Sequence, residues 1–173
     1  MEKDPSKNEK EFLDGYDQWS DALFRHCFFR VRDRETAKDI VQETYIKTWH
    51  YIQRGHEIEN LRAFLYRVAN NLIIDWSRKK KESSLDSLMN QGFDVPMYVK
   101  DRYDAVIEGR HILEIIKDMD PKYRDAILMR YIDDLTPKEI SQVVDESENV
   151  ISVRIHRGLQ QLRKILDEKN YGR

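Results

Sequence analysis

Residues 135–162 decide the fold, and they read LTPKEISQVVDESENVISVRIHRGLQQL. Thr136 and Glu139 have the spacing of a capping box, and Pro137 stands at the first helical position, where proline is tolerated. Apolar residues recur at helical spacing on both sides of the polar pair Asp145–Glu146. The stretch therefore predicts a short helix, a tight turn and a longer helix, which is the arrangement of a helix-turn-helix.

The longer helix, which Ser147 can cap, is predicted to have a buried stripe and an exposed polar face. Spacing places Ile151, Ile155, Gly158 and Leu162 on the buried stripe. The opposite face carries amide, hydroxyl, imidazole and guanidinium groups, which can read base edges or contact phosphates in a major groove. The candidate DNA-binding residues of this helix are Asn149, Ser152, Val153, Arg154, His156 and Arg157, with Arg154 at the boundary and suited to a phosphate. The alternative is an ordinary helical hairpin with a solvated charged face.

The composition excludes several classes of protein. The chain has 173 residues, 40% hydrophobic and 36% charged, with a mean hydropathy of −0.77. We find neither an apolar run long enough to span a bilayer nor the apolar segment of a signal peptide, so we expect no membrane insertion and a cytoplasmic location. The single cysteine, Cys27, excludes a disulfide framework. Six glycines and four prolines argue against a strand-and-turn architecture and favour an all-α protein.

Basic charge is concentrated in two segments. Residues 61–81 carry six basic residues and one acid, and residues 148–164 carry four basic residues and one acid. Residues 1–21 and 82–109 are acidic. A protein that coats nucleic acid would be basic throughout, so this alternation indicates two discrete nucleic-acid contacts in a chain that also meets another partner.

Helical periodicity divides the chain into two halves. The predicted helices span about residues 12–31, 37–52, 61–81, 106–119, 121–131, 136–144 and 148–166. Asp33, Asn60 and Asp120 precede helices as N-caps. Periodicity is lost between Glu82 and Asp101, where turn-forming residues gather. We predict two small helical domains, residues 1–81 and 102–173, joined by a flexible linker over residues 82–101, with the helix-turn-helix in the second.

The basic helix predicted over residues 61–81 offers a second candidate nucleic-acid surface. Spacing projects Tyr66, Arg67, Asn70, Ile73, Ile74 and Ser77 outward. An aromatic ring, an amide and cations together suit unpaired bases, which stack on rings while the cations follow the phosphates. Two isoleucines that point away from the core also indicate a covered surface. The alternative is that these cations only favour the C-terminal end of the helix dipole.

Other polar residues receive structural interpretations. His26 and Cys27 have no ligand partners at metal spacing. Asp75 is expected to be a structural acid, either in an ion pair or as a helix cap. The sequence contains no glycine-rich phosphate loop, nucleophile elbow or paired catalytic carboxylates. We therefore expect no catalytic residues, no metal site and no cofactor.

Three segments resemble one protein family. Residues 39–49, DIVQETYIKTW, resemble the polymerase-binding helix of bacterial RNA polymerase sigma factors. Residues 60–76, NLRAFLYRVANNLIIDW, resemble their promoter-melting helix, and residues 135–162 resemble their C-terminal domain. The small size and the two domains match the extracytoplasmic-function (ECF) subgroup. Where this family usually has glycine or another small residue in the C-terminal turn, the chain has Asp145, which tolerates a left-handed conformation better than most residues.

The resemblance implies a sigma factor that binds core RNA polymerase and directs it to promoter DNA. It implies that Asp39, Gln42 and Glu43 bind polymerase, and the apolar Ile46 beside the Gln42–Glu43 pair is expected to complete the contact. It places the minus-ten element on the loop of residues 53–59 and the following helix, and the minus-thirty-five element on the last helix. The DNA-binding residues implied between the loop and the linker are Asn60, Arg62, Tyr66, Arg67, Asn70, Asn71, Arg78 and Lys79. The linker would lie in the RNA exit path, and an anti-sigma factor stays open as a further partner.

Two other functions stay open at this point. A stand-alone helix-turn-helix regulator explains the second half of the chain but leaves residues 39–49 without a role, and it is expected to dimerise on paired half-sites. A helical adaptor without a nucleic-acid role predicts no DNA binding even when polymerase is present.

Overall fold

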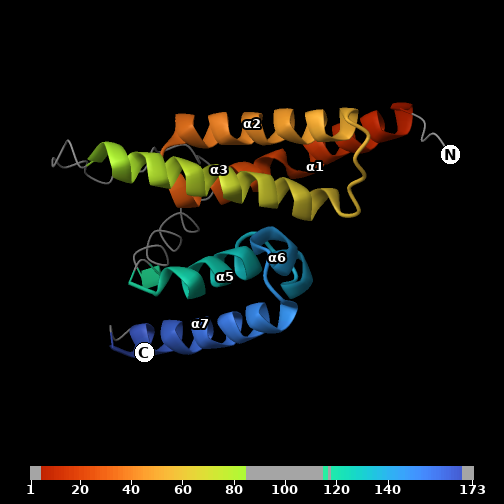
Figure 1. The fold of residues 1–173 in the computed structure, drawn as a ribbon. Coiled ribbons are helices and arrows are strands. Elements are labelled where there is room, and N and C mark those ends of the chain that lie inside the picture. The colour runs from red at the N-terminus through yellow and green to blue at the C-terminus, as the bar shows by residue number, and fades with distance from the viewer. Residues whose placement is uncertain (1–4, 85–114, 117, 169–173) are drawn as a thin grey trace, which may run out of the picture. The chain divides into compact units, whose positions relative to one another are not determined.

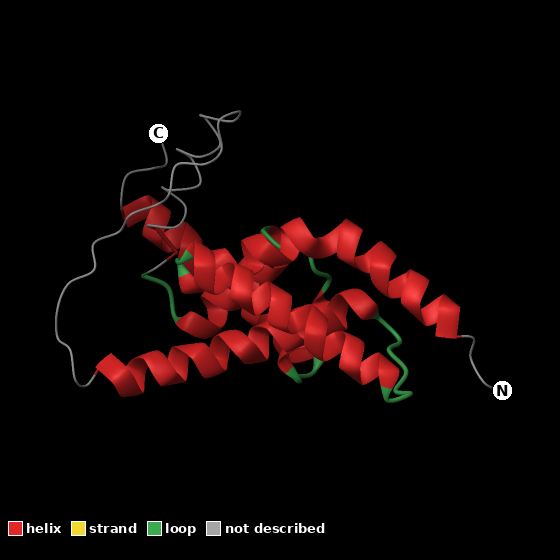
Figure 2. Ribbon diagram, turned by 90° about the horizontal axis from the view of Figure 1, so that it is seen from above, coloured by secondary structure: helices red, strands yellow, loops and turns green. Residues whose placement is uncertain are grey.

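A computed structural model describes residues 5–84, 115–116 and 118–168, and every regular element among them is a helix, as predicted. The helices are α1 (Pro5–Val31), α2 (Arg34–Gln53), α3 (Leu61–Ser84), α5 (Pro121–Tyr131), α6 (Pro137–Val144) and α7 (Glu148–Glu168). The chain divides into two compact units, the first with α1, α2 and α3 and the second with α5, α7 and the start of α6 (Figure 1). Figure 2 shows only helices and loops among the described residues. None of the described helices is long and apolar enough to cross a membrane.

The predicted end of the third helix needs one adjustment. α3 continues to Ser84, three residues beyond the predicted end of the third helix at residue 81. The rest of the predicted linker lies outside the described residues, as does most of the helix predicted over residues 106–119. Ile115 and Ile116 are helical and buried.

A two-residue link makes α1 and α2 antiparallel neighbours. Arg32 adopts a left-handed conformation with φ of 59°, and its N–H donates to the carbonyl of Phe28 at 2.9 Å, which ends α1. Asp33 then caps α2 as predicted, accepting from the backbone N–H of Thr36 at 2.7 Å. Hydrogen bonds from the Thr36 hydroxyl and N–H hold the pKa of Asp33 below its ordinary value. These two residues are therefore enough to reverse the direction of the chain.

Aromatic packing fills the first unit. The Phe12 ring lies 5.1 Å from the Trp49 ring and 5.9 Å from the Tyr45 ring, which joins α1 to α2. Burial raises the pKa of Tyr45. α3 packs against both of these helices (Figure 1), and its Tyr66 ring meets the His26 ring edge-on at 4.9 Å. Both of these rings are fully buried, so α3 contributes an aromatic side chain to the centre of the unit.

The start of α3 lies close against α1. Asn60 caps this helix as predicted, because its side-chain oxygen accepts from the backbone N–H of Ala63 at 3.0 Å. A Cβ atom added at Gly15 would lie 2.8 Å from Cδ2 of Leu61 and 2.9 Å from the Trp19 ring. Glycine is therefore the residue that allows this close approach.

The second unit is built on α5 and α7. Ile116, Met119, Ile127 and Leu128 form its buried cluster. Partly buried side chains packed on the cluster are Tyr123, Ile155, Leu162 and Ile165. A Cβ atom added at Gly158 would lie 2.8 Å from Cγ1 of Ile127, so the absence of a side chain on α7 lets the two helices approach closely.

The turn between α6 and α7 forms as the sequence predicts. The backbone N–H of Thr136 donates to Glu139 at 2.8 Å, and the N–H of Glu139 donates to the Thr136 hydroxyl at 3.2 Å, which completes the capping box. Asp145 is left-handed with φ of 57°. The N–H of Glu146 donates to the carbonyl of Ser141 at 3.1 Å, which is the hydrogen bond of a Schellman motif. Ser147 caps α7 by accepting from the N–H of Val150 at 3.3 Å.

Candidate polymerase and DNA interfaces

One face of α2 carries the predicted polymerase-binding residues. Asp39, Gln42, Glu43 and Ile46 recur at spacings of three and four, which places them together on the helix surface. Asp39 and Gln42 are exposed, and the apolar Ile46 is 43% exposed. Glu43 is partly exposed and pairs with Lys47 at 3.3 Å. We call these four residues the α2 patch, and its polar rim around an exposed isoleucine agrees with the sequence-based expectation of exposure.

The predicted outward face of α3 needs a correction. Tyr66 is 0% exposed and Ile73 is 6% exposed, so their outward projection was wrong. Because α3 packs against two helices, a wider arc of its surface is buried than a helix with one neighbour buries. Tyr66 therefore cannot stack on a base. Ile74, in contrast, is 56% exposed as predicted.

The other predicted DNA-binding residues of the first unit differ in exposure. Arg67, Asn71, Arg78 and Lys79 are exposed. Arg78 pairs with the exposed Asp75 at 3.2 Å, the structural ion pair that the sequence suggested.

The remaining three residues are less exposed. Asn60, Arg62 and Asn70 are partly buried. The Asn60 side chain caps α3, and the Arg62 guanidinium lies 6.0 Å from the centre of the Tyr66 ring. These contacts tie both residues to the fold of the first unit.

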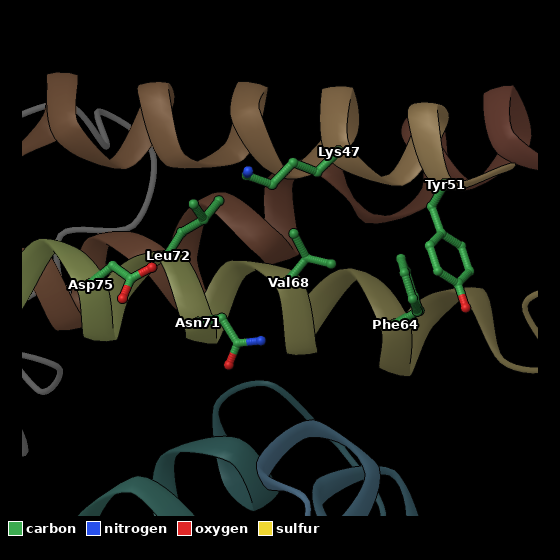
Figure 3. A pocket seen from close by; sticks show the side chains of 7 residues that line it. All are labelled: Lys47, Tyr51, Phe64, Val68, Asn71, Leu72 and Asp75. Carbon is green, nitrogen blue, oxygen red and sulfur yellow. The ribbon is translucent and has the colours of Figure 1, made fainter. Parts of the chain in front are cut away.

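A pocket of about 320 Å³ lies between α2 and α3 (Figure 3). Its lining residues are Lys47, Tyr51, Phe64, Val68, Asn71, Leu72 and Asp75. The Tyr51 ring lies 4.8 Å from the Phe64 ring and 4.4 Å from the His56 ring, so aromatic groups cluster at the end nearest the loop of residues 54–60. The apolar side chains of Val68 and Leu72 line the remainder, together with amide, carboxylate and ammonium groups (Figure 3).

Sequence reasoning missed most of this pocket. Lys47 and Tyr51 are four residues apart on α2, and Phe64, Val68 and Asp75 recur at helical spacing on α3. In the sequence alone, each of these two sets of residues looks like one side of an ordinary helix. Only the pairing of the two helices shows that the two sets face each other.

The outer face of α7 matches its predicted projection. Asn149, Ser152, Val153, His156 and Arg157 are exposed, whereas Ile151 and Gly158 are buried. Arg154 is at the boundary as predicted, and it forms an ion pair of 2.7 Å with Glu146. The DNA contacts of these residues remain predictions.

The part of the chain that the structure describes holds no cluster of three or more histidine, cysteine or acidic side chains that could bind a metal ion. His26 and Cys27 are both fully buried in the first unit.

Comparisons with known proteins decide the family. Residues 16–83 match the family Sigma-70 region 2, and residues 110–162 match the family Sigma-70, region 4. The ECF RNA polymerase sigma factor SigW of Bacillus subtilis (strain 168) is 30% identical over 169 residues, which cover 92% of this chain and 90% of SigW. The chain belongs to the ECF RNA polymerase sigma factors. The ECF RNA polymerase sigma factor SigM of the same organism is 26% identical over 159 residues, with 87% and 91% covered.

Two solved structures share the fold. The sigma factor RpoE in complex with the anti-sigma factor NepR, from Bartonella quintana, superposes with a TM-score of 0.70 at 19% identity, over 91% of this chain and 98% of that chain. CnrH in complex with the cytosolic domain of CnrY gives a TM-score of 0.69 at 21% identity, over 95% and 92%.

As an ECF sigma factor, the chain binds core RNA polymerase and promoter DNA and directs transcription initiation. The family is non-catalytic. The predicted function is therefore confirmed, and it replaces the stand-alone regulator and the adaptor.

Proposed function

We propose that three surfaces of this sigma factor have separate roles in transcription initiation. The α2 patch binds core polymerase, the pocket and exposed cations of α3 hold the melted minus-ten strand, and the outer face of α7 reads the minus-thirty-five duplex. The observation that carries this proposal is the α2 patch, because a protein that bound only DNA would not need an exposed apolar residue with a polar rim on this helix.

The α2 patch has the composition of a small protein interface. Ile46 supplies an exposed apolar centre, and Gln42 and Asp39 supply a polar rim. The Glu43–Lys47 pair is about half exposed, at 47% and 51% for the two side chains. Exposed pairs of this kind contribute little to stability, so a partner helix can replace Lys47 as the contact of Glu43.

The pocket between α2 and α3 suits one unpaired base. Its volume of about 320 Å³ is at the small end of the range for ligand sites. Tyr51 and Phe64 offer ring faces for stacking, and Asn71 and Asp75 offer hydrogen-bonding groups for a base edge. Lys47 adds a cation for the adjoining phosphate. The loop of residues 54–60 leads directly into α3, so the captured base lies beside this loop.

The outer face of α7 carries the groups that direct readout of a duplex needs. Ser152 and Asn149 offer hydroxyl and amide groups, and Arg157 offers a guanidinium that can bind guanine. Val153 is 42% exposed and can contact a thymine methyl group.

We place this activity in the cytoplasm, where RNA polymerase acts. We also propose an anti-sigma factor as a partner of the chain. The support is the fold shared with RpoE, which was solved with the anti-sigma factor NepR, and the exposed apolar side chain that the α2 patch offers.

The test is transcription reconstituted with core polymerase and the Gln42→Ala, Glu43→Ala double variant. We expect loss of polymerase association and of promoter-specific transcripts, with stability changed by less than about 0.5 kcal/mol. Asp17→Ala with Gln18→Ala is the matched control, because it removes one exposed carboxylate and one exposed amide from α1. Circular dichroism checks the fold of both. Equal transcription from the two double variants would remove the α2 patch as the polymerase interface.

A further inference from the structure

Two arginines of α7 differ in their surroundings. Arg157 is exposed and forms no ion pair with another residue that the structure describes. The Arg154 guanidinium donates to a carboxylate oxygen of Glu146 at 2.7 Å. Glu146 lies eight residues earlier in the chain, in the turn between α6 and α7. One arginine therefore faces solvent with its full charge, and the other is paired with a carboxylate at the surface.

The geometry of the turn explains the pair. Helical side chains lean toward the helix N-terminus, which directs Arg154 back toward the turn. The left-handed Asp145 and the hydrogen bond from the Glu146 N–H to the Ser141 carbonyl fix the backbone that carries the carboxylate. The two side chains are 26% and 39% exposed, so the pair is also partly shielded from water.

We propose that Glu146 limits the sequence-independent affinity of α7 for DNA, because it neutralises Arg154 and so keeps this charge from adding to phosphate binding. The inference rests on the proposed function of α7 as the reader of a duplex. Non-specific binding to DNA depends on the release of counterions by unpaired cations, and a neutral ion pair releases none. Sequence is read by contacts to base edges, which the exposed residues of α7 supply. Because a phosphate contact carries no sequence information, pairing Arg154 lowers the affinity for right and wrong sequences alike.

The test compares wild type with Glu146→Gln, each full chain assembled with core polymerase. The two DNA probes are a duplex whose upstream element the wild-type holoenzyme selected from random sequences and the same duplex with that element scrambled. Affinities are measured between about 50 and 200 mM salt, the range over which phosphate contacts change binding strongly.

For the scrambled probe, we expect the slope of log affinity against log salt to steepen by about 0.9 in Glu146→Gln, the value for one phosphate contact. Its gain over wild type should then be about 3.5-fold larger at the lowest salt than at the highest. The slope for the selected probe should steepen by a similar amount, because phosphate contacts do not depend on sequence. An unchanged slope, or equal weakening on both probes as a purely structural brace predicts, would overturn the proposal.

Two further variants isolate the role of Arg154. In an Arg154→Gln background, Glu146→Gln should no longer steepen the slope, because the chain then has no guanidinium that loss of the Glu146 carboxylate could free for a phosphate. Glu148→Gln removes an exposed carboxylate from the same end of α7, and its effect should be the same in both backgrounds. Steepening by Glu146→Gln that persists without Arg154 would overturn the proposal.

The proposed role of α7 and the proposed role of Glu146 are contradicted by different results. If the wild-type holoenzyme does not distinguish the selected from the scrambled upstream element, α7 is not the reader, and both ideas are wrong. If it does distinguish them but the Glu146 variant behaves like wild type, only the role of Glu146 is wrong.

Discussion

α3 and α7 are both amphipathic helices with basic residues, yet their surroundings differ. α3 packs against α1 and α2, whereas α7 packs against α5. The buried residues of α3 are Ala63, Leu65, Tyr66, Ala69 and Ile73, and those of α7 are Ile151 and Gly158. At about 100° per residue these sets span about 160° on α3 and about 20° on α7.

The difference shows when the exposed residues of a helix can be predicted reliably from their spacing in the sequence. A helix with one neighbour buries one stripe, so residues off the stripe are exposed, as found on α7. A helix with two neighbours also buries its flanks, and flank residues such as Tyr66 then belong to the core.

The comparison is tested most strongly by Tyr66→Ala. Loss of this fully buried ring and its contact with His26 should destabilise the first unit by about 3–5 kcal/mol. All three tryptophans, Trp19, Trp49 and Trp76, lie in that unit, so urea unfolding followed by tryptophan fluorescence reports on it alone.

The control is Ile74→Ala on the same helix, where the side chain is 56% exposed. Its effect should be below about 0.5 kcal/mol, as is usual at surface positions. A Tyr66 variant as stable as the Ile74 variant would mean that Tyr66 lies on the outer face of α3.

Gly158→Ala tests the single packed side of α7. The added Cβ atom would meet Ile127 at 2.8 Å and the Tyr123 carbonyl oxygen at 3.2 Å. Overpacking should exceed the gain in helix propensity and leave a net loss of about 1.5 kcal/mol. Far-UV circular dichroism should show earlier unfolding of the second unit while the tryptophan transition stays in place. A more stable variant would mean that α5 and α7 pack less closely than described.

Thr136→Ala tests the entry to the helix-turn-helix. It removes the side-chain half of the capping box with Glu139, so we expect a loss of about 1 kcal/mol in the second unit. Ser141→Ala in the same helix is the control, because its hydroxyl only bonds the Lys138 carbonyl and caps nothing. Urea unfolding monitored by circular dichroism should separate the two variants, and equal stabilities would argue against the capping box.

Asp145→Gly has the smallest expected effect and the opposite sign. Glycine adopts the left-handed conformation of this residue without steric cost, so we expect a gain of about 0.5 kcal/mol. Gly55→Ala, at φ of 81° in the first unit, should reverse the sign and lose about 1 kcal/mol. Thermal unfolding of the two variants checks both signs, and a destabilised Asp145→Gly would show that the aspartate side chain itself supports the turn.

Local features of the fold were predictable because they depend on neighbours in sequence. The caps at Asp33, Asn60, Asp120, Thr136 and Ser147 all form, since each needs only a backbone N–H two or three residues onward. The left-handed Asp145 follows from the shortness of the turn.

Features that depend on two elements were not predictable. The burial of Tyr66 requires knowledge that α3 has two neighbours, and the pocket requires the pairing of α2 with α3. The Glu146–Arg154 pair depends on how a turn and a helix meet in space.

The two-residue link between α1 and α2 has a consequence for the order of folding. Short links join partners that are close in sequence, and such local contacts form quickly. Domains generally fold as units from the N-terminus during synthesis. The α2 patch is therefore expected to be complete before α7 has been translated, so a nascent chain displays the surface proposed to bind polymerase before it has the helix proposed to read DNA.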